Sequence, residues 1–532
     1  MISLDGNTLD IASFVSIVRG GENVAMLGDA RARMEKSLRW VQSVADGKIC
    51  GPAGESLAVY GVNTGYGSLA RVRIESHQIE ELSFNLIRSH AAGVGPSLDS
   101  EAVRGMMLLR ANALAKGASG CRPELVETLL EMLNAGLVPE IPSQGSCGSS
   151  GDLAPLSHLA LVVFRGPDAD VPEESGWAWL DGVRYRGSEA MRKAGIERLI
   201  PGPKEGLAMN NGAQLTTSIA ALTCFDARRL ILAAEVAAAM SWEAMRGVTR
   251  ALHPGVHALR PYPGAVACAA NLRALMHGSS LTDSLPDKVQ DAYSIRCTPQ
   301  VLGAVRDGVA YASKQVGIEL NAATDNPVIL LEGEGPNKAY SAGLFHGEPV
   351  GLAADHLKLV CSELGALSER RIFRLTTASL SSRLPPLLAE SSGLGLMAPQ
   401  TTAAALVSEN RSLGYPSSAD SLPTCEDQED LVAMSTTAAR RAREVLRNSR
   451  DVVAIELLCA ARALWVRMES DPDCVLGQGT AAALGAVEEI LGGRGGEVPS
   501  EDMMRLSEGL KAGRVLPAVL QAVPQLVEVS GE

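Results

Sequence analysis

The sequence predicts a mainly α-helical protein. Its 532 residues are 46% hydrophobic but only 4% aromatic, so Ala, Leu and Val must fill a large core, as closely packed helices allow. Apolar side chains also recur at helical steps of three and four residues, from Val305 to Leu320 and from Leu357 to Leu367. A β-sandwich or barrel would need more aromatic and β-branched residues than this chain has.

Three segments are expected along the chain. Residues 1–203 form an N-terminal domain, which is punctuated by glycine clusters and closed by a proline-rich patch at 199–203. Residues 204–470 form a central helix bundle, and 226–246 is apolar nearly all round, as expected in the middle of such a bundle. Residues 471–532 are rich in Gly and acidic residues and are expected to form a small C-terminal helical cap.

Composition and charge argue against several kinds of partner. The formal net charge is −13, so a nucleic-acid partner is not expected. The longest apolar-looking stretch, 213–225, carries polar residues and is shorter than the roughly 20 residues that cross a bilayer, so no membrane partner is expected. The ten cysteines lack CxxC spacing and the N-terminus lacks the basic region of a signal peptide, which predicts reduced thiols in a cytoplasmic protein.

The segment 145–158, Gly-Ser-Cys-Gly-Ser-Ser-Gly-Asp-Leu-Ala-Pro-Leu-Ser-His, has the most distinctive chemistry. Its composition alone is typical of a tight turn that leads into a helix, with Asp152 near the N-cap. The nitrogen of Gly151, with no Cβ beside it, can also approach the carbonyl carbon of Ser149 and close a five-membered ring. Loss of water from Ser150 would then leave an exocyclic methylidene, an electrophile built from the chain itself.

This segment resembles the signature of the ammonia-lyases that carry a 4-methylidene-imidazol-5-one (MIO) prosthetic group, the histidine, phenylalanine and tyrosine ammonia-lyase family. Further segments between about residues 60 and 430 resemble blocks of that family in the same order. The resemblance is nearest to the histidine-type members. The segments are Tyr60–Gly67, Asn85–Gly93, Asn211-Gly212, Lys288–Cys297, Asn321–Pro327, Phe345–Pro349 and Ser408–Asn410.

The resemblance implies a fold, a cofactor and an assembly. The fold would be a long helix bundle of the fumarase and aspartase kind, with an α-rich N-terminal domain that carries the prosthetic group. The MIO group would form autocatalytically from Ser149, Ser150 and Gly151, and neither a metal nor a nucleotide would be needed. The assembly would be a homotetramer with shared active sites, acting on a small amino acid.

The implied function is elimination of ammonia from L-histidine to give urocanate, a reaction of histidine catabolism. In the family the substrate amine adds to the methylidene of Ser150, and a base removes a proton from the carbon beta to the carboxylate. By its place in the motif Tyr60 would be that base. A phenol is a weak base at pH 7, so a nearby cation or electrophile must favour its anion. Tyr60 could equally be a core tyrosine at the end of a short apolar strand, 57–60.

Further residues match substrate-binding positions of the family. Arg296 would bind the substrate carboxylate through a bidentate pair, with Tyr293 beside it as a further catalytic residue. Asn211 would donate to the prosthetic ring or to the carboxylate as charge develops. Gln290 and Phe345 would line the pocket. Each has an ordinary explanation when taken alone, such as a surface arginine or an Asn-Gly turn.

Two positions suggest the substrate. Ser89-His90 is similar to the pair found in histidine-type members, and Glu409 falls where phenylalanine-type members usually have Gln. A neutral imidazole has one N–H donor and one acceptor nitrogen. Glu409 could accept a hydrogen bond from the N–H, and His90 could donate one to the other nitrogen. A phenyl ring would leave the side chains of Glu409 and His90 without hydrogen-bond partners, which costs a free energy of about 1–3 kcal/mol for each. The alternatives are a histidine at a loop start and a solvated helix carboxylate.

Some positions depart from the family pattern, which leaves the substrate open. Ser149 stands where the family usually has Ala, although ring closure does not need that side chain. Ala213, Ala292 and Leu431 also replace residues that are common in the family. A tyrosine or phenylalanine ammonia-lyase, or a 2,3-aminomutase, is therefore the first alternative. The second is a relative that has lost catalysis and acts as a binding protein.

His253 and His257 have the spacing of a metal-binding pair on a helix. Pro254 and Gly255 lie between them and are expected to break the helix that would bring both rings onto one face. No metal site is therefore expected.

Overall fold

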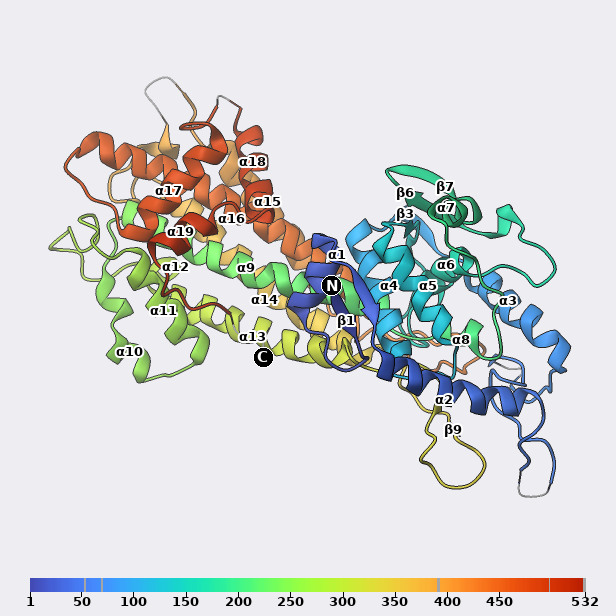
Figure 1. The fold of residues 1–532 in the computed structure, drawn as a ribbon. Helices are drawn as coiled ribbons and strands as arrows, with labels where there is room; N and C mark the ends of the chain where they lie inside the picture. The colour runs from blue at the N-terminus through green and yellow to red at the C-terminus, as the bar shows by residue number, and fades with distance from the viewer. Residues whose placement is uncertain (52–53, 68–69, 390–392, 497, 530–532) are drawn as a thin grey trace. The chain divides into compact units, whose positions relative to one another are not determined.

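The computed structural model describes residues 1–51, 54–67, 70–389, 393–496 and 498–529. It is mainly helical with a few short strands, which confirms the predicted fold class (Figure 1). The chain forms two compact units, each made of three stretches of sequence. Unit 1 comprises Met1–Leu222, Gln315–Ala354 and Pro416–Arg440, and unit 2 comprises Thr223–Lys314, Asp355–Tyr415 and Arg441–Glu532. The division into three segments at residues 203 and 470 stays a prediction.

Unit 1 contains all the strands of the described residues, in four small sheets. β1 pairs with β2 in parallel, whereas β3–β5, β4–β6–β7 and β8–β9 are antiparallel. The strands are β1 Ile2–Leu4, β2 Val24–Met26, β3 Val94–Ser97, β4 Val138–Pro139, β5 Pro142–Gln144, β6 Trp177–Leu180, β7 Val183–Arg186, β8 Val328–Ile329 and β9 Ala339–Tyr340. The helices wholly in unit 1 are α1 Ile11–Gly20, α2 Gly28–Ala45, α3 Ile79–His90, α4 Ser100–Ala115, α5 Pro123–Asn134, α6 Leu153–Val163, α7 Gly187–Ala194 and α8 Glu205–Asn210.

Among the described residues of unit 2, the regular elements are all helices, joined by turns and loops. Four long helices run from one unit into the other along the sequence: α9 Gln214–Ala244, α13 Thr298–Glu319, α14 Glu348–Thr376 and α16 Ser435–Ser470. The helices wholly in unit 2 are α10 Pro254–Ala258, α11 Pro263–Leu275, α12 Tyr293–Arg296, α15 Met397–Leu413, α17 Gln478–Leu491, α18 Pro499–Lys511 and α19 Leu516–Ala522.

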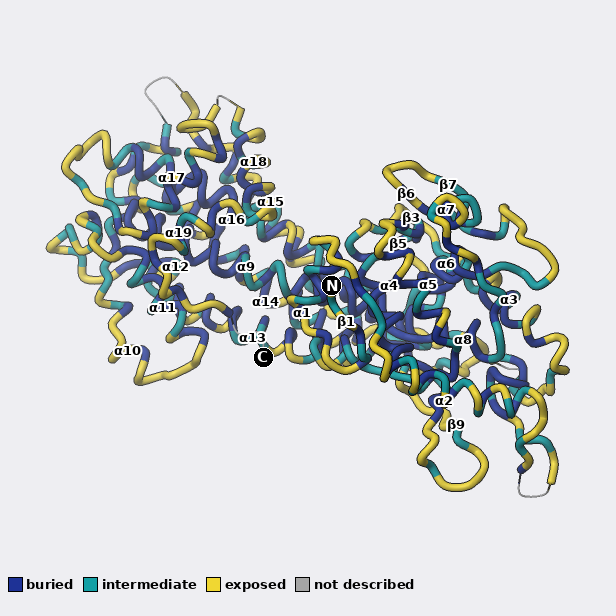
Figure 2. The backbone as a smooth tube through the Cα atoms, in the orientation of Figure 1, coloured by how far each residue is buried: buried dark blue, intermediate teal, exposed yellow. Residues whose placement is uncertain are grey.

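The long helices form the buried core, as their apolar patterns predict. Every residue of α9 from Leu230 to Ala244 is buried, which confirms that this apolar segment lies inside a bundle (Figure 2). The stripe from Val305 to Leu320 on α13 is at most 2% exposed, and the stripe from Leu357 to Leu367 on α14 is also buried. Burial of such stripes accounts for most of the stability of long helices.

Two pieces of unit 1 packing position the residues discussed below. Helix α6 packs against α3 and α8, and it begins at Leu153, one residue after the Ser149–Gly151 triplet. The loop around Tyr60 is anchored by Val59 and Val62, which pack in one cluster with Val41 of α2 and Ile329 of β8.

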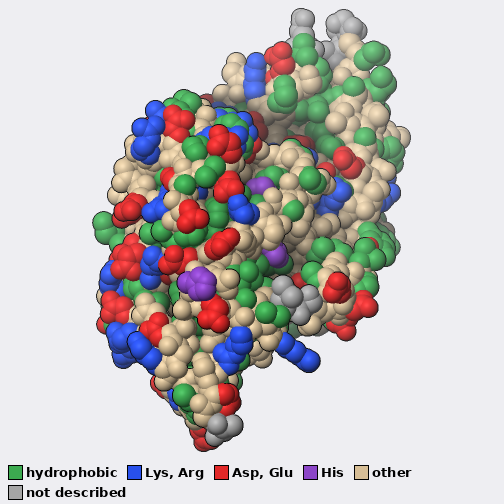
Figure 3. Space-filling model, turned by 90° about the vertical axis from the view of Figure 1, so that its right-hand side faces the viewer, with side chains coloured by type: hydrophobic (Ala, Val, Ile, Leu, Met, Phe, Trp, Pro, Cys, Tyr) green, Lys and Arg blue, Asp and Glu red, His purple; other side chains and the backbone are tan. Residues whose placement is uncertain are grey.

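On its surface the protein mixes charges of both signs. Figure 3 shows Lys and Arg side chains interspersed with Asp and Glu on the face that it presents. Over the described residues, none of the helices combines the length and the apolar character that crossing a membrane requires.

Candidate active site

The Ser149-Ser150-Gly151 triplet lies in a turn whose backbone suits ring closure. Gly151 has φ +77°, in the left-handed region that favours glycine, and it forms a parallel bridge with Gly212. A Cβ at residue 151 would collide with the backbone of Gly212. The next residue, Asp152, donates its N–H to the Gly212 carbonyl at 2.7 Å. Only glycine therefore fits at the position whose nitrogen the MIO ring requires, and the triplet fits that group.

The buried carboxylate of Asp152 fixes this turn to two helices. It accepts hydrogen bonds from the Thr436 hydroxyl at 2.6 Å, the Ser146 hydroxyl at 2.8 Å and the Thr216 N–H at 2.9 Å. Burial raises the pKa of Asp152, and these hydrogen bonds oppose the rise. Because Thr216 is in the first turn of α9 and Thr436 is in the first turn of α16, the triplet is held against both helix ends.

Asn211 contacts the triplet directly. Its Nδ2 donates to the carbonyl oxygen of Ser150 at 2.6 Å. The backbone carbonyl of Asn211 accepts from the fully buried Arg110 at 2.8 Å, which holds this segment in place. In a cyclised triplet the Ser150 carbonyl is the ring carbonyl, so Asn211 is placed to polarise the ring, as its sequence motif predicts.

A pocket of about 830 Å³ in unit 1 opens onto the triplet. It brings together six residues that the sequence predicts for the site, and it adds others that sequence reasoning missed. The predicted six are Tyr60, His90, Ser149, Ser150, Asn211 and Phe345; the additional ones include Tyr66, Leu153, Asn210, Asn326, His346 and Glu429. No Lys or Arg is among the described residues that line this pocket.

Tyr60 lies in a loop that leaves its side chain partly exposed to the pocket. The expectation of a short strand over 57–60 is wrong, because this segment is irregular and the Val59 N–H donates to the Asn63 side chain at 2.9 Å. The Tyr60 hydroxyl accepts from the Gly67 N–H at 3.2 Å, and its ring lies edge-on to Tyr66 with centroids 6.3 Å apart. Burial raises the pKa of Tyr66 to about 12, so the Tyr66 phenol stays protonated.

His90 ends helix α3 and presents one ring nitrogen to its own helix. Its Nδ1 lies 2.8 Å from the Leu86 carbonyl, so Nδ1 carries the proton of the neutral ring and Nε2 is an acceptor. The sequence predicts that His90 donates a hydrogen bond to an imidazole substrate, but in the neutral ring the Nε2 atom of His90 can only accept one. Ser89 does not line the pocket; its hydroxyl donates to the same carbonyl at 2.9 Å.

Glu429 is the carboxylate that sequence reasoning missed. Its Oε2 accepts from the Ser149 hydroxyl at 2.8 Å and from the Thr424 hydroxyl at 2.6 Å, and its Oε1 accepts from the Ser150 hydroxyl. Burial acts to raise the pKa of Glu429, but the hydroxyl donors outweigh it and the pKa is lowered. The sequence signal for Glu429 is the acidic segment Glu426–Asp430, which lies far along the chain from the triplet.

The remaining four predicted residues belong to unit 2 and do not line this pocket. Tyr293 begins α12 and is 72% exposed. The Arg296 Nε donates to the Asp291 carbonyl at 2.9 Å, and its guanidinium lies 5.0 Å from the centroid of the Tyr293 ring. Gln290 and Glu409 are both exposed, Glu409 on α15. Their roles stay predictions.

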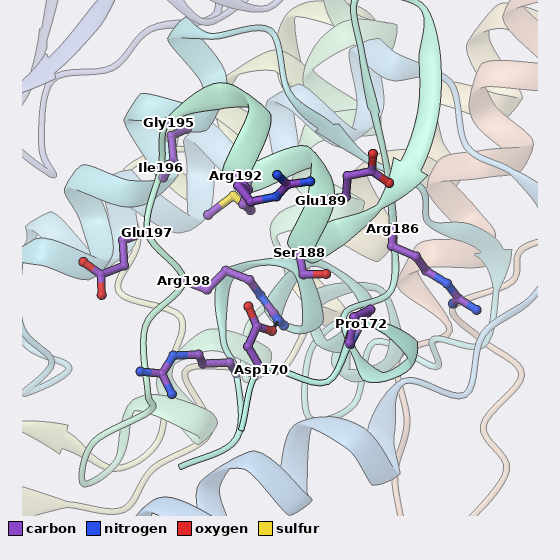
Figure 4. Close-up of a pocket in the computed structure, with 12 residues that line it drawn as sticks. Asp170, Pro172, Arg186, Ser188, Glu189, Arg192, Gly195, Ile196, Glu197 and Arg198 are labelled. Carbon is purple, nitrogen blue, oxygen red and sulfur yellow. Dashed lines mark hydrogen bonds and ion pairs between the residues drawn. The ribbon is translucent and has the colours of Figure 1, made fainter. Parts of the chain in front are cut away.

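A second cavity in unit 1, of about 710 Å³, lies beside α7 (Figure 4). Arg198, which lines this cavity, forms an ion pair with Asp170. Its guanidinium also donates hydrogen bonds to the carbonyls of Val162 at 3.1 Å and Leu161 at 2.7 Å, at the end of α6. Arg186 points away from this pair in Figure 4. Arg198 therefore stabilises the C-terminal end of α6.

The two histidines of the segment 253–257 serve the local backbone. His253 is the N-cap of α10, where its Nδ1 accepts from the Gly255 N–H at 3.0 Å. His257 Nε2 lies 3.2 Å from the Ala251 carbonyl. The helix begins at Pro254, so His253 lies outside it and the two histidines do not share one helix face. Within the described part of the chain, no group of three or more His, Cys, Asp or Glu side chains is arranged to hold a metal.

The sequence and the fold are similar to those of known proteins. The family model described as "Aromatic amino acid lyase" matches residues 9–489. A histidine ammonia-lyase of Caldanaerobacter subterraneus subsp. tengcongensis is 45% identical over 470 residues, which cover 88% of each chain. The crystal structure of histidine ammonia-lyase from Trypanosoma cruzi has a TM-score of 0.87 at 36% identity, covering 98% of this chain and 96% of that one.

A tyrosine aminomutase from Streptomyces globisporus is also similar in structure, with a TM-score of 0.89 at 33% identity, covering 99% of this chain and all of that one. The fold, the glycine-restricted triplet and these similarities lead to one conclusion. The chain belongs to the aromatic amino acid lyase family.

Proposed function

We propose that this carbon–nitrogen lyase eliminates ammonia from L-histidine to give urocanate. The observation that carries the proposal is the chemistry of the unit 1 pocket, where a carboxylate, Glu429, and an imidazole, His90, lie in the same cavity as Ser150. Glu429 can accept the N–H of an imidazole substrate, whereas a phenyl substrate would leave that carboxylate without a partner. The similarity to histidine ammonia-lyases points the same way.

The prosthetic group of this proposal forms from the chain. The Gly151 nitrogen bonds to the Ser149 carbonyl carbon, whose oxygen leaves as water, and Ser150 loses a second water from its side chain. The resulting MIO group supplies an electrophile that makes the substrate amine a better leaving group. Asn211 would bind its ring carbonyl, and the Gly212 backbone would lie against its glycine edge.

The protein side chains supply the remaining chemistry. Tyr60 takes the proton from the carbon beta to the substrate carboxylate. Glu429 accepts the imidazole N–H, and Phe345 forms an apolar wall of the pocket. Arg296 binds the substrate carboxylate, with Tyr293 beside it.

A substrate panel tests this proposal. Purified enzyme is incubated with L-histidine, L-tyrosine and L-phenylalanine, and both acrylate products and β-amino acid isomers are measured. Urocanate formation with histidine preferred is the expected result. The alternative, a tyrosine or phenylalanine lyase or a 2,3-aminomutase, is favoured by the likeness to tyrosine aminomutase. Turnover of tyrosine without histidine would establish that alternative and refute the imidazole argument.

Glu429→Gln is expected to lower kcat/KM for histidine about tenfold or more, because a charged acceptor of the imidazole N–H becomes neutral. Glu409→Gln makes the same change in the carboxylate that the sequence predicts for this role and that does not line the unit 1 pocket, so the pair of variants decides between the two carboxylates. Steady-state kinetics on histidine and on the best phenyl substrate check this. A selective loss of histidine turnover in Glu409→Gln, with Glu429→Gln unaffected, would return the imidazole role to Glu409.

We further propose a homotetramer in which different subunits complete each site. The pocket at the triplet has no Lys or Arg among its described lining residues, yet an amino-acid substrate carries a carboxylate. The predicted carboxylate ligand Arg296 and its neighbour Tyr293 are on unit 2, and Tyr293 is largely exposed. A second copy of the chain can supply both groups, as in other closed symmetric assemblies.

Mixed assemblies test the shared site. Tyr60→Phe and Arg296→Ala are each expected to be inactive alone, but tetramers co-expressed from both variants are expected to regain up to about a quarter of the wild-type sites by random mixing. Light scattering gives the oligomeric state, and dual affinity tags isolate the mixed species. Mixed tetramers with no regained activity would place both residues of a site on one subunit.

We also propose a cytoplasmic location. All ten cysteines are free of disulfide bonds, which is typical of proteins kept in a reducing compartment.

A further inference from the structure

The two oxygens of the Glu429 carboxylate have different partners. Oε2 accepts from two hydroxyls, those of Ser149 at 2.8 Å and Thr424 at 2.6 Å. Oε1 accepts from the Ser150 hydroxyl. One oxygen is therefore held by side chains that flank the reactive residue, and the other by the reactive residue itself.

Ring formation acts on these three hydroxyls unequally. Dehydration of Ser150 removes the donor to Oε1, whereas cyclisation uses only the backbone carbonyl of Ser149 and leaves its hydroxyl in place. This step rests on the proposed function. After it, Oε2 retains both of its hydroxyl donors, and Oε1, which has lost its hydroxyl donor, can accept from a substrate.

We propose that Ser149 is a positioning residue for Glu429. Its hydroxyl, together with that of Thr424, holds Oε2 in the mature enzyme and so directs Oε1 to the substrate imidazole. The usual alanine of the family at this position could not donate such a hydrogen bond. The residue that departs from the pattern of the triplet thus acts on the carboxylate beside the ring and not on the ring itself.

The charges around Glu429 fit this role. The thiols of Cys147 and Cys425 have their pKa values raised, mainly by burial and further by the Glu429 charge, so both stay neutral. Glu426, Asp430, Tyr60, His90 and His346 also line the pocket. Because the pKa of Glu429 is lowered in part by the Ser149 hydrogen bond, removal of that donor must raise it. The carboxylate then protonates at a higher pH.

The test compares Ser149→Ala, Ser149→Thr and Thr424→Val with wild type, all as full-length enzyme. In Ser149→Ala the acid limb of the kcat/KM profile is expected to move up by about half a pH unit, since one hydrogen bond to a charged group is lost. Thr424→Val should move it in the same direction, because it removes the other donor to Oε2. Ser149→Thr keeps the hydroxyl and should restore the wild-type limb. The profile is measured on the best substrate of the panel.

Two further measurements separate this inference from the proposed function. Intact mass reports the loss of two waters and therefore ring formation, which Ser149→Ala should retain. A crystal structure of the mature enzyme should show the Ser149 hydroxyl still bonded to Oε2. Wild type without water loss would refute the proposed function. Normal water loss together with an unmoved acid limb in Ser149→Ala, or a Ser149 hydroxyl turned away from Glu429, would overturn the positioning role alone.

Discussion

Tyr60→Phe is expected to lower kcat by about 10²- to 10⁴-fold, the range that a general base contributes. The change removes one hydroxyl, which accepts from the Gly67 N–H and lines the pocket at the triplet. The loop should keep its place, because Val59 and Val62 anchor it and neither is altered. Circular dichroism should therefore match wild type, and intact mass should still show the loss of two waters, while turnover falls.

Tyr66→Phe is the matched control for this prediction. Tyr66 lines the same pocket and lies edge-on to Tyr60, but the pKa of its buried phenol is raised to about 12, so it is not suited to accept a proton. Its loss should cost far less activity than that of Tyr60. Near-normal activity in Tyr60→Phe would remove Tyr60 as the base.

Ser150→Ala is expected to abolish turnover, with a loss of about 10³-fold or more, because no methylidene can form without the Ser150 hydroxyl. The variant should fold normally, since the turn is held by Gly151, Asp152 and Asn211. Mass spectrometry should show that the water from the side chain is no longer lost.

Ser149→Ala provides the comparison within the same turn. It also removes one serine hydroxyl from the triplet, yet it should still lose two waters and keep substantial activity. If Ser150→Ala turned substrate over at the wild-type rate, the electrophile would have to come from another source, and the proposed chemistry would fail.

The helices could be predicted from the sequence because their cause is local. The stripes on α13 and α14 are buried, and α9 is buried along most of its length, as the repeat of apolar residues requires. The segment 57–60 shows the opposite case. Its apolar residues favour a strand, but the Val59 N–H donates to the Asn63 side chain, and within the described residues no strand pairs with this segment.

The residues that line the pocket could be predicted from the sequence only where they belong to a recognisable motif. The triplet and Asn211 could be matched by their motifs, and they lie together in the structure. Glu429 is 279 residues from Ser150, and nothing local in the sequence pairs an acidic loop with that serine. The direction of His90 was also beyond the sequence, because the Leu86 carbonyl decides which ring nitrogen carries the proton.

The loop that carries Glu429 has a conformational cost. Thr424 and Glu429 pair through their backbones, and the turn between them places Cys425, Glu426 and Asp427 at positive φ, although none is glycine. A left-handed residue with a side chain costs ~1–2 kcal/mol, so three in succession consume an appreciable part of a marginal folding free energy. The chain therefore gives up stability to present one carboxylate in a fixed direction, and this loop is where gains in thermal tolerance and gains in catalysis should oppose each other.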